Sequence, residues 1–440
     1  MTQPVEKIIY NGILLTMDGN MSVIEDGAIA ISGDAILATG KTQEILLSFT
    51  ADEKIDAHGA IIMPGLINTH THLAMVLLRG LAEDLPLWPW LQQVWKAEAA
   101  FMTPANVALA SRLGMVESIM GGVTCSVDMY WHPERTAQAA RDLGFRLVNG
   151  PVFLDSDHAP DGYSFADREP FARDFLTEFR DDPLIHPMFM PHSTVTDSPD
   201  ALKKVKALAD KHQVDLNMHC AETATEAQDV FKRYGKTPVE LLNSIGLLDG
   251  RIILAHCVHV TPQEIDILAQ KGVTVAHNPV SNLKLASGIA PVFPMLQKGV
   301  NVTIGTDGAQ SSNDLDMWWP VRLTALLQKE HYQDASLMKA PDMIKMVTIN
   351  AAKGIGLGDR IGSLETGKKA DLLLINLKSP HLTPMYDVYA QLVYTIGRED
   401  VESVMINGQW IMQHRELVTI DVDEIMTKVD QISQEIKKTI

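Results

Sequence analysis

An apolar strand that ends in a His-x-His pair is the feature that most constrains this chain. The strand covers residues 61–67 and continues through Asn68 and Thr69 into His70 and His72. Side chains two residues apart on a strand point to the same side, roughly 6.6 Å apart along it, so both imidazoles can face one metal ion. A lone His-x-His pair would be weak evidence, so its meaning depends on the rest of the chain.

Three more apolar strands, far along the chain, end in potential metal ligands. His219, His256 and Asp307 each follow a predicted strand at the point where a polar loop begins. Imidazole and carboxylate ligands without thiolates suit a catalytic zinc ion, or iron in the same geometry, with one position left open for water. One such histidine alone is more often a hydrogen-bonded core residue. Together with the first pair, these residues predict a metal-dependent enzyme.

The middle of the chain, residues 61–364, alternates strands with helices. The predicted strands are 61–67, 123–129, 146–153, 185–190, 215–218, 251–255, 273–276 and 300–304. Such a series fits an α/β fold of the (β/α)8 TIM barrel type, whose active site lies at the C-terminal ends of the strands. A doubly wound sheet is the alternative, but no Gly-x-Gly-x-x-Gly or Walker sequence follows any of these strands. In a closed barrel, the strand ends that carry the candidate ligands converge.

Both ends of the chain are rich in strands and turn signals. An Asn-Gly pair at residues 11–12 lies between two apolar runs, which is the strongest short hairpin signal. The pairs at residues 33–34 and 407–408 have the same setting. Each of the three pairs therefore predicts a β-hairpin.

These terminal strands predict a second, smaller domain. Because chain ends commonly lie close together, we expect one β-sandwich domain from residues 1–60 and 365–440, beside a barrel domain of residues 61–364. Apolar residues recur at helical spacing over the last twenty residues and predict an amphipathic helix. That helix could bind a partner, but we expect it to pack on its own terminal domain.

Composition limits the partners and the location. The formal net charge of -18 over 440 residues disfavours nucleic acid and anionic membranes, and leaves a small uncharged or zwitterionic substrate. The chain contains neither an apolar run near the roughly 18 residues of a membrane span nor a signal-peptide pattern at its start, so we expect a cytoplasmic protein. Its three cysteines lack Cys-x-x-Cys spacing, which disfavours disulfides and thiolate metal sites. The sequence leaves the oligomeric state open, a homo-oligomer included.

Several motifs together carry a family resemblance that covers nearly the whole chain. They lie at residues 64–72, 78–84, 219–222, 255–258, 277–285, 305–308 and 362–371. In these motifs the chain resembles the amidohydrolase superfamily, and within it the 5'-methylthioadenosine/S-adenosylhomocysteine deaminases and their nucleobase- and triazine-hydrolysing relatives.

The resemblance implies a hydrolytic deaminase of adenosine-type nucleosides, namely 5'-methylthioadenosine, S-adenosylhomocysteine or adenosine. The products would be the inosine analogue and ammonia. The alternative is a deaminase or hydrolase of another aminated ring, such as guanine, a pterin or a triazine. A non-catalytic scaffold on the same fold is a remote third possibility, because every ligand position is filled.

The resemblance also implies one metal ion. Family members with two metals carry a carboxylated lysine at the end of strand four, where this chain has Pro191 and His192. A single divalent ion, zinc or alternatively iron, is therefore implied. His256 would hydrogen-bond the water that this ion activates, without being a principal ligand. The implied ligands are His70, His72, His219 and Asp307.

Glu222 indicates the type of reaction. It lies three residues beyond His219, just past the strand end. Water displaces an aromatic amine only when the ring is made electrophilic, which protonation of the neighbouring ring nitrogen achieves. We expect Glu222 to donate that proton and Asp307 to take the proton of the attacking water, whose pKa a metal lowers from about 16 towards about 7. The alternative role for Glu222 is to satisfy backbone donors at a helix start.

The segment 88–98 after strand one combines aromatic rings with a carboxylate. By resemblance, Glu98 would accept the two ribose hydroxyls and Trp90 would line the pocket. Without a ligand role, the same segment would be an amphipathic lid helix on the mouth of the barrel. His192 matches a family position that contacts the nucleoside, and its alternative is a supporting role behind the site.

Three further positions bear on the substrate. Ser281 and Asn282, after strand seven, would help to shape the base pocket. Asn149 departs from the family pattern, because some members place there an arginine that holds the homocysteine carboxylate. An unpaired buried carboxylate is costly. Asn149 therefore argues against S-adenosylhomocysteine more than against methylthioadenosine or adenosine.

Overall fold

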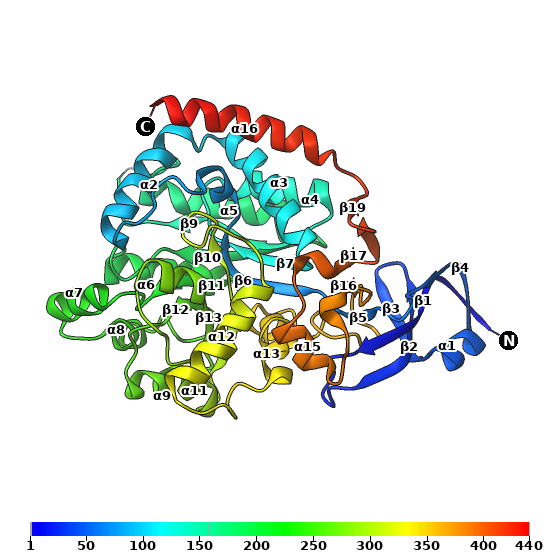
Figure 1. Cartoon of the computed structure of the whole chain (residues 1–440). Coiled ribbons are helices and arrows are strands. Elements are labelled where there is room, and N and C mark those ends of the chain that lie inside the picture. Colours follow the sequence, from blue (N-terminus) through cyan, green and yellow to red (C-terminus); the bar gives the residue numbers. More distant parts are fainter. Residues whose placement is uncertain (1, 158, 440) are drawn as a thin grey trace.

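The computed structural model describes residues 2–157 and 159–439. These residues form two sheets, one from the middle of the chain and one from both ends (Figure 1). The predicted α/β barrel with an additional β-structure from the chain termini is therefore confirmed. Within the described residues, no helix is both long and apolar enough to cross a membrane.

The larger sheet is a parallel barrel. Its strands are β6 (Leu66–His72), β7 (Val123–Asp128), β8 (Arg146–Asn149), β9 (Val152–Phe153), β10 (Ile185–Pro191), β11 (Asp215–Cys220), β12 (Ile252–His256), β13 (Thr274–His277), β14 (Asn301–Ile304) and β15 (Asp307–Gly308). They follow the order β14-β13-β12-β11-β10-β8-β7-β6-β15, with β9 paired to β10. Because β14 and β15 are successive parts of one segment, the pairing of β15 with β6 closes the sheet.

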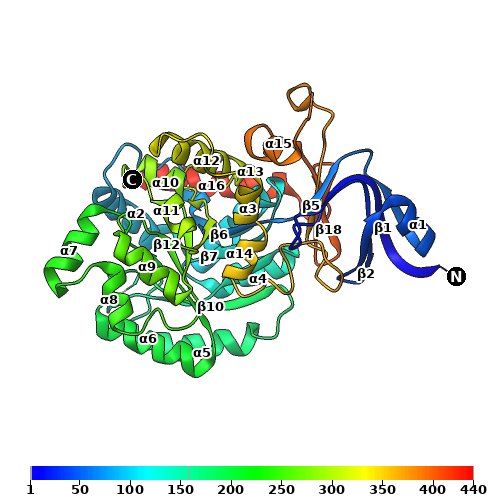
Figure 2. The ribbon, with the colours of Figure 1, turned by 90° about the horizontal axis from the view of Figure 1, so that it is seen from below.

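Helices surround the barrel, as Figure 2 shows from below. They are η1 (Leu73–Leu78), α2 (Leu87–Phe101), α3 (Pro104–Met120), α4 (Pro133–Leu143), η2 (Phe165–Asp167), α5 (Arg168–Phe179), α6 (Pro199–His212), α7 (Ala224–Tyr234), α8 (Pro238–Ser244), α9 (Pro262–Lys271), α10 (Pro279–Lys284), α11 (Val292–Gln297), α12 (Trp318–His331), α13 (Ala340–Met346) and α14 (Ile349–Gly354). Several of them begin with a hydroxyl N-cap and a proline in the first turn: Thr103, Ser198 and Thr261 each accept a backbone N–H. This pairing fixes where a helix begins.

The smaller sheet is built from both chain ends, so that the blue and orange strands of Figure 1 lie side by side. Its order is β19-β18-β17-β16-β5-β1-β2-β3, with β4 paired to β1. Aliphatic side chains such as Ile9, Ile29 and Leu372 form its core. The elements of the two ends are β1 (Gln3–Leu15), β2 (Val23–Ser32), β3 (Ala35–Lys41), α1 (Thr42–Ser48), β4 (Phe49–Asp56), β5 (Ile61–Pro64), β16 (Leu372–Ile375), η3 (Pro380–Leu382), α15 (Val388–Tyr394), η4 (Arg398–Asp400), β17 (Val401–Ile406), β18 (Gln409–Gln413) and β19 (Glu416–Leu417).

The first predicted barrel strand, 61–67, is in fact divided between the two sheets. β5 pairs with β1 and β16 of the terminal sheet, whereas β6 begins the barrel. The chain passes between them at Gly65, where a Cβ atom would lie 2.0 Å from Oγ1 of Thr124. Both strands are fully buried, so their joint apolar run concealed the boundary. The division into domains at residues 60 and 365 remains a prediction.

The three predicted hairpins have different outcomes. Turns at residues 33–34 and 407–408 join β2 to β3 and β17 to β18, as predicted. The hairpin at residues 11–12 was wrong, because β1 runs through this pair with a register shift. Asn11 has a positive φ of 63°, and a Cβ on Gly12 would lie 2.7 Å from the Ile62 side chain. Here the Asn-Gly pair makes a bulge that allows β5 to approach closely.

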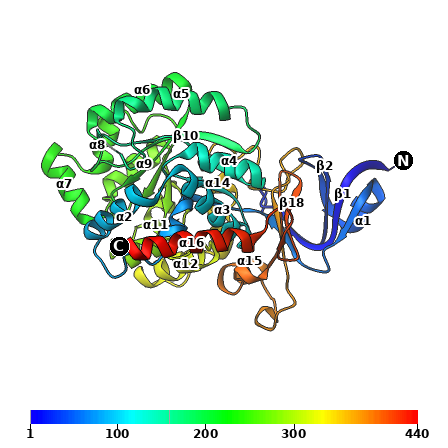
Figure 3. The same ribbon diagram turned by 90° about the horizontal axis from the view of Figure 1, so that it is seen from above.

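The predicted C-terminal helix is α16 (Val422–Thr439), but its predicted packing was wrong. Figures 1 and 3 show it lying across α3 of the barrel, and it also contacts η1. Ile425, Val429 and Ile436 are its buried apolar residues. An apolar stripe shows that a helix will be covered, but not which surface covers it.

Candidate active site

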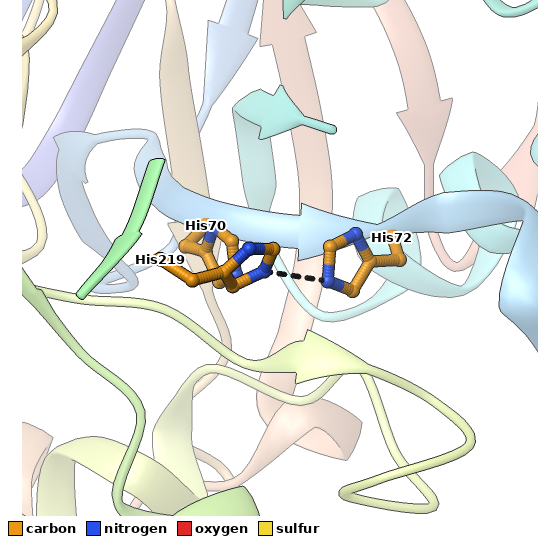
Figure 4. A group of neighbouring side chains, drawn as sticks. All are labelled: His70, His72 and His219. Atoms are coloured by element: carbon orange, nitrogen blue, oxygen red, sulfur yellow. Dashed lines mark hydrogen bonds between the residues drawn. The ribbon is translucent and has the colours of Figure 1, made fainter. Parts of the chain in front are cut away.

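The carboxyl ends of the barrel strands bring the predicted metal ligands together. His70 and His72 belong to β6, His219 to β11 and Asp307 to β15. Nε2 of His72 is 3.5 Å from Nε2 of His219 and 3.1 Å from Oδ1 of Asp307. The same carboxylate oxygen is 3.5 Å from Nε2 of His70. Figure 4 shows the three imidazoles gathered beside β6, with the dashed line between the two Nε2 atoms.

Backbone carbonyls set the tautomers of two of these imidazoles. Nδ1 of His72 lies 2.5 Å from the carbonyl oxygen of Met129, and Nδ1 of His219 lies 2.9 Å from that of His192. A carbonyl oxygen can only accept, so each Nδ1 carries the proton and each Nε2 presents a lone pair. Two lone pairs facing each other beside a carboxylate oxygen repel, unless a cation lies between them.

His70 supports the same conclusion. Within the described residues neither of its ring nitrogens has a hydrogen-bond partner, although the side chain is fully buried. Burial lowers the pKa of His70 to about 4, so the ring is neutral, as a metal ligand must be. Ligand atoms about 2.0–2.1 Å from a tetrahedral ion stand roughly 3.3 Å apart, close to the observed separations. This donor set fits a divalent metal ion.

Glu222 and His256 face each other next to this cluster. Oε2 of Glu222 is 3.8 Å from Nε2 of His256. Nδ2 of Asn282 donates to Nδ1 of His256 at 2.8 Å, so Nε2 of His256 carries the proton and is itself a donor. Burial raises the pKa of Glu222 and favours its protonated form. A hydrogen-bond donor and a carboxyl group of raised pKa therefore lie side by side.

Asp307 is held in the ionised state. Burial alone would raise its pKa, but the adjacent imidazoles of His70 and His72 hold the pKa of Asp307 well below its usual range. Its Oδ2 accepts from the hydroxyls of Ser281 at 2.6 Å and Ser311 at 2.8 Å. Ser281 thus orients Asp307, as Asn282 orients His256. Their contribution to a base pocket stays a prediction.

Left-handed backbone conformations mark three strand ends of the site. Ala221, His256 and Asp307 have φ values of 51°, 74° and 62°. Such a conformation costs a residue with a side chain roughly 1–2 kcal/mol and persists where the surroundings determine it.

The predicted sugar ligand, Glu98, is buried in α2. Its Oε1 accepts from the Tyr130 hydroxyl at 2.7 Å and its Oε2 from Nε1 of Trp131 at 3.2 Å. Burial raises the pKa of Glu98. The rings of Tyr130 and His72 have centroids 6.3 Å apart, so Tyr130 links Glu98 to the histidine cluster. Trp90, on the same helix, is also buried.

His192 and Asn149 occupy different positions relative to the cluster. The His192 ring is 4.9 Å from the His219 ring, and its Nδ1 is 2.9 Å from Oγ1 of Thr196. Burial lowers the pKa of His192 to about 4, so the ring is neutral. Asn149 is fully buried and donates to the carbonyl oxygen of Pro133 at 2.9 Å.

Sequence analysis missed several residues that contact the candidates. Tyr130 and Trp131 hold Glu98, and they follow β7 at the carboxyl edge, so the rule that found the other strand-end residues could have found them. Ser311 lies four residues after Asp307. This spacing indicates a contact between side chains only in a helix, and the segment is not one. Glu226 lies four residues after Glu222 in a stretch that is rich in polar residues, where a further carboxylate carries no signal.

A closed barrel with imidazole and carboxylate donors converging at its carboxyl edge defines a class, the metal-dependent barrel enzymes. The model of the Amidohydrolase family matches residues 61–411. The chain belongs to this family, as the sequence motifs predicted, and it is a hydrolase that acts on C–N bonds.

Known proteins match almost the whole chain. A 5-methylthioadenosine/S-adenosylhomocysteine deaminase from Thermodesulfovibrio yellowstonii is 42% identical over 96% of each chain. A 5'-deoxyadenosine deaminase from Methanosarcina mazei is 38% identical over 98% of each chain. Among solved structures, an adenosine deaminase from Xanthomonas campestris with bound zinc is 36% identical, with a TM-score of 0.97 over 100% of both chains.

Proposed function

We propose that this protein is a metal-dependent deaminase of adenosine-type nucleosides: 5'-methylthioadenosine, S-adenosylhomocysteine or adenosine. One observation carries the proposal. Glu222, whose pKa is raised by burial, lies at the same carboxyl edge of the barrel as the ionised Asp307 and the converging histidines. This arrangement pairs a proton donor with a proton acceptor, as the exchange of an aromatic amine for water requires. The deaminase names of the relatives support the same substrate class.

One divalent ion, zinc or alternatively iron, would supply Lewis acidity that lowers the pKa of the attacking water. The proposed ligands of this ion are His70, His72, His219 and Asp307. The tautomers of His72 and His219, the ring nitrogens of His70 without a hydrogen-bond partner among the described residues, and the short separations between the ligand atoms support this set. His256 lies outside this set, because its Nε2 carries a proton and cannot ligate.

The side chains divide the proton transfers between them. Glu222 donates its proton to the ring nitrogen beside the amine-bearing carbon, which becomes electrophilic. Asp307 takes the proton of the attacking water, while Ser281 and Ser311 hold its other oxygen. His256 donates a hydrogen bond from Nε2 to the oxygen of that water. Asp307 then passes the proton it took to the amine, which leaves as ammonia. Glu222 takes the proton of the hydroxyl group left on the ring carbon and is protonated again.

The substrate-binding roles rest on neighbouring residues. Glu98 would accept the ribose hydroxyls in place of Tyr130 and Trp131, and Trp90 would line the pocket beside it. The neutral ring of His192 would contact the nucleoside. Asn149 offers no positive charge for a homocysteine carboxylate, which favours methylthioadenosine and adenosine over S-adenosylhomocysteine.

An ammonia-release screen tests the function. Its substrates are adenosine, methylthioadenosine, S-adenosylhomocysteine, guanine, pterins and triazines, and we expect the highest kcat/KM for an adenosine-type nucleoside. Preferential turnover of guanine, a pterin or a triazine would establish the alternative ring hydrolase instead. No turnover of any substrate by the metal-replete protein would favour a non-catalytic scaffold.

Elemental analysis of the same preparation tests the metal site. We expect about one zinc or iron per chain, because the proposed ligands form one tetrahedral-type set. Two metals per chain would overturn the single-ion site.

A further inference from the structure

Glu226, in the first turn of α7, binds the segment that carries Glu222. Its Oε1 accepts from the backbone N–H of Ala221 at 3.0 Å, and its Oε2 accepts from the backbone N–H of Glu222 at 2.7 Å. The Thr194 hydroxyl also donates to Oε1, at 2.9 Å. One carboxylate thus joins the loops that follow two neighbouring strands, β10 and β11.

This contact differs from ordinary helix capping. A glutamate at the third helical position commonly accepts from the N–H of its own N-cap residue. The N-cap of α7 is Thr223, whose hydroxyl accepts from the N–H of Glu226 at 3.1 Å. The two N–H groups that Glu226 accepts belong to residues before Thr223, outside the helix. Glu226 therefore serves the strand-end turn in addition to its own helix.

The turn needs such support, because its backbone is strained. Ala221 has a left-handed φ of 51°, which is unfavourable for a residue with a side chain. Its carbonyl oxygen accepts from the N–H groups of Val258 and His259 at 3.0 and 2.9 Å. The loop after β12 therefore holds one side of this peptide segment and Glu226 the other, and together they set the direction in which the Glu222 side chain leaves the backbone.

The charge of Glu226 acts on Glu222 as well. Burial raises the pKa of Glu222, and the negative charges of Asp307 and Glu226 act in the same direction, while His256 opposes them. A carboxylate behind the turn therefore favours the protonated form of Glu222, which is the form that can donate.

We propose that Glu226 is a positioning residue, which fixes the turn of Ala221 and Glu222 so that the Glu222 carboxyl group meets the ring nitrogen of the substrate. Glu226 touches neither the substrate nor the proposed ligands. The catalytic part of this inference rests on the proposed function, whereas the structural part does not.

Glu226→Gln tests both parts, with Asp229→Asn as the control, because Asp229 is an exposed carboxylate on the same helix. The amide has one acceptor oxygen for three donors, and its NH2 group would face a backbone N–H. We expect kcat to fall roughly ten- to a hundredfold, as for a misplacement of about 1 Å, with KM, metal content and Tm nearly unchanged. Asp229→Asn should leave kcat unchanged. A kcat of Glu226→Gln equal to that of the control would overturn the proposal.

A double variant separates positioning from general damage. If Glu226 acts through Glu222, adding Glu226→Gln to Glu222→Gln should cost no further activity, because the group being positioned can no longer donate. Losses that multiply in the double variant would show that Glu226 acts by another route, and the proposal would fall.

Amide hydrogen exchange supplies a measurement that does not depend on the reaction. In the metal-loaded protein, Glu226→Gln should speed exchange of the amides of Ala221 and Glu222 on the order of tenfold, whereas Asp229→Asn should not. Unchanged exchange would overturn the positioning role, whatever the kinetics. Faster exchange in a protein that deaminates no nucleoside would refute the proposed function and leave the positioning role in place.

Discussion

The carboxyl edge of the barrel and the sheet built from the chain ends are buried to a similar degree but are made of opposite chemistry. In the terminal sheet the buried side chains, such as Ile9 and Leu372, are aliphatic and pack against one another. At the carboxyl edge, imidazoles and carboxylates are crowded together, and His70 lacks a hydrogen-bond partner among the described residues. The first region stabilises the fold, whereas the second is stable only because the fold and a cation hold it.

This contrast predicts that substitutions at the edge change turnover, while substitutions in the terminal sheet change stability. The largest effect on turnover is expected for Glu222→Gln. The amide cannot donate the proton to the ring nitrogen, so ammonia release should fall by roughly 10² to 10⁴ with metal content and Tm unchanged. Steady-state kinetics and metal analysis check this outcome. Activity within tenfold of the parent would exclude Glu222 as the acid.

His256→Ala should follow, with a loss of roughly a hundredfold, because one donated hydrogen bond to the reacting water disappears. Metal content should stay at the parent level, since Nε2 of His256 carries a proton and does not ligate. Loss of the metal together with activity would place His256 among the ligands and contradict the proposed ligand set.

Glu98→Ala should have a smaller and substrate-dependent effect. For methylthioadenosine or adenosine, kcat/KM should fall roughly ten- to a hundredfold, about 1.4 to 2.7 kcal/mol of lost transition-state binding. The comparison is with a 2',3'-dideoxy analogue, which lacks the hydroxyls that Glu98 would accept. Equal discrimination between nucleoside and analogue by parent and variant would mean that Glu98 does not recognise the sugar.

The smallest effect on turnover is expected in the terminal sheet. Ile62→Ala removes a fully buried side chain from the core of that sheet and should lower the free energy of unfolding by about 2–5 kcal/mol. Denaturant unfolding measures this loss, and kcat/KM at 25 °C should remain within about twofold of the parent. A large fall in kcat/KM of the folded variant would show that the two regions are coupled.

The parts of the site that could be predicted follow from strand geometry alone. His70 and His72 lie on one face of β6 because side chains on a strand alternate. Strand ends of a closed barrel converge whatever the loops between them contain, so His219 and Asp307 could be placed beside them from their positions in the chain.

The parts that could not be predicted depend on contacts between distant segments. The Asn-Gly pair at residues 11–12 forms a bulge rather than a turn because Ile62 packs against Gly12. Helix α16 packs on α3 because that surface is available in the folded chain. Likewise, the acceptors and donors around Glu98 and Glu226 come from other loops, and no local pattern specifies them.

The passage of the chain from β5 to β6, between the two sheets, also has a consequence for synthesis of the protein. β5 pairs with β16, and the N–H of Gly65 donates to the carbonyl oxygen of Asp371 immediately before the strand that ends in His72. During synthesis at about 5–20 residues per second, β5 leaves the ribosome about 300 residues, or roughly 15–60 s, before its partner. During that time the edge of β5 that pairs with β16 has no partner strand. A chain released at residue 365 would contain every proposed metal ligand and still lack the strand that anchors the start of β6.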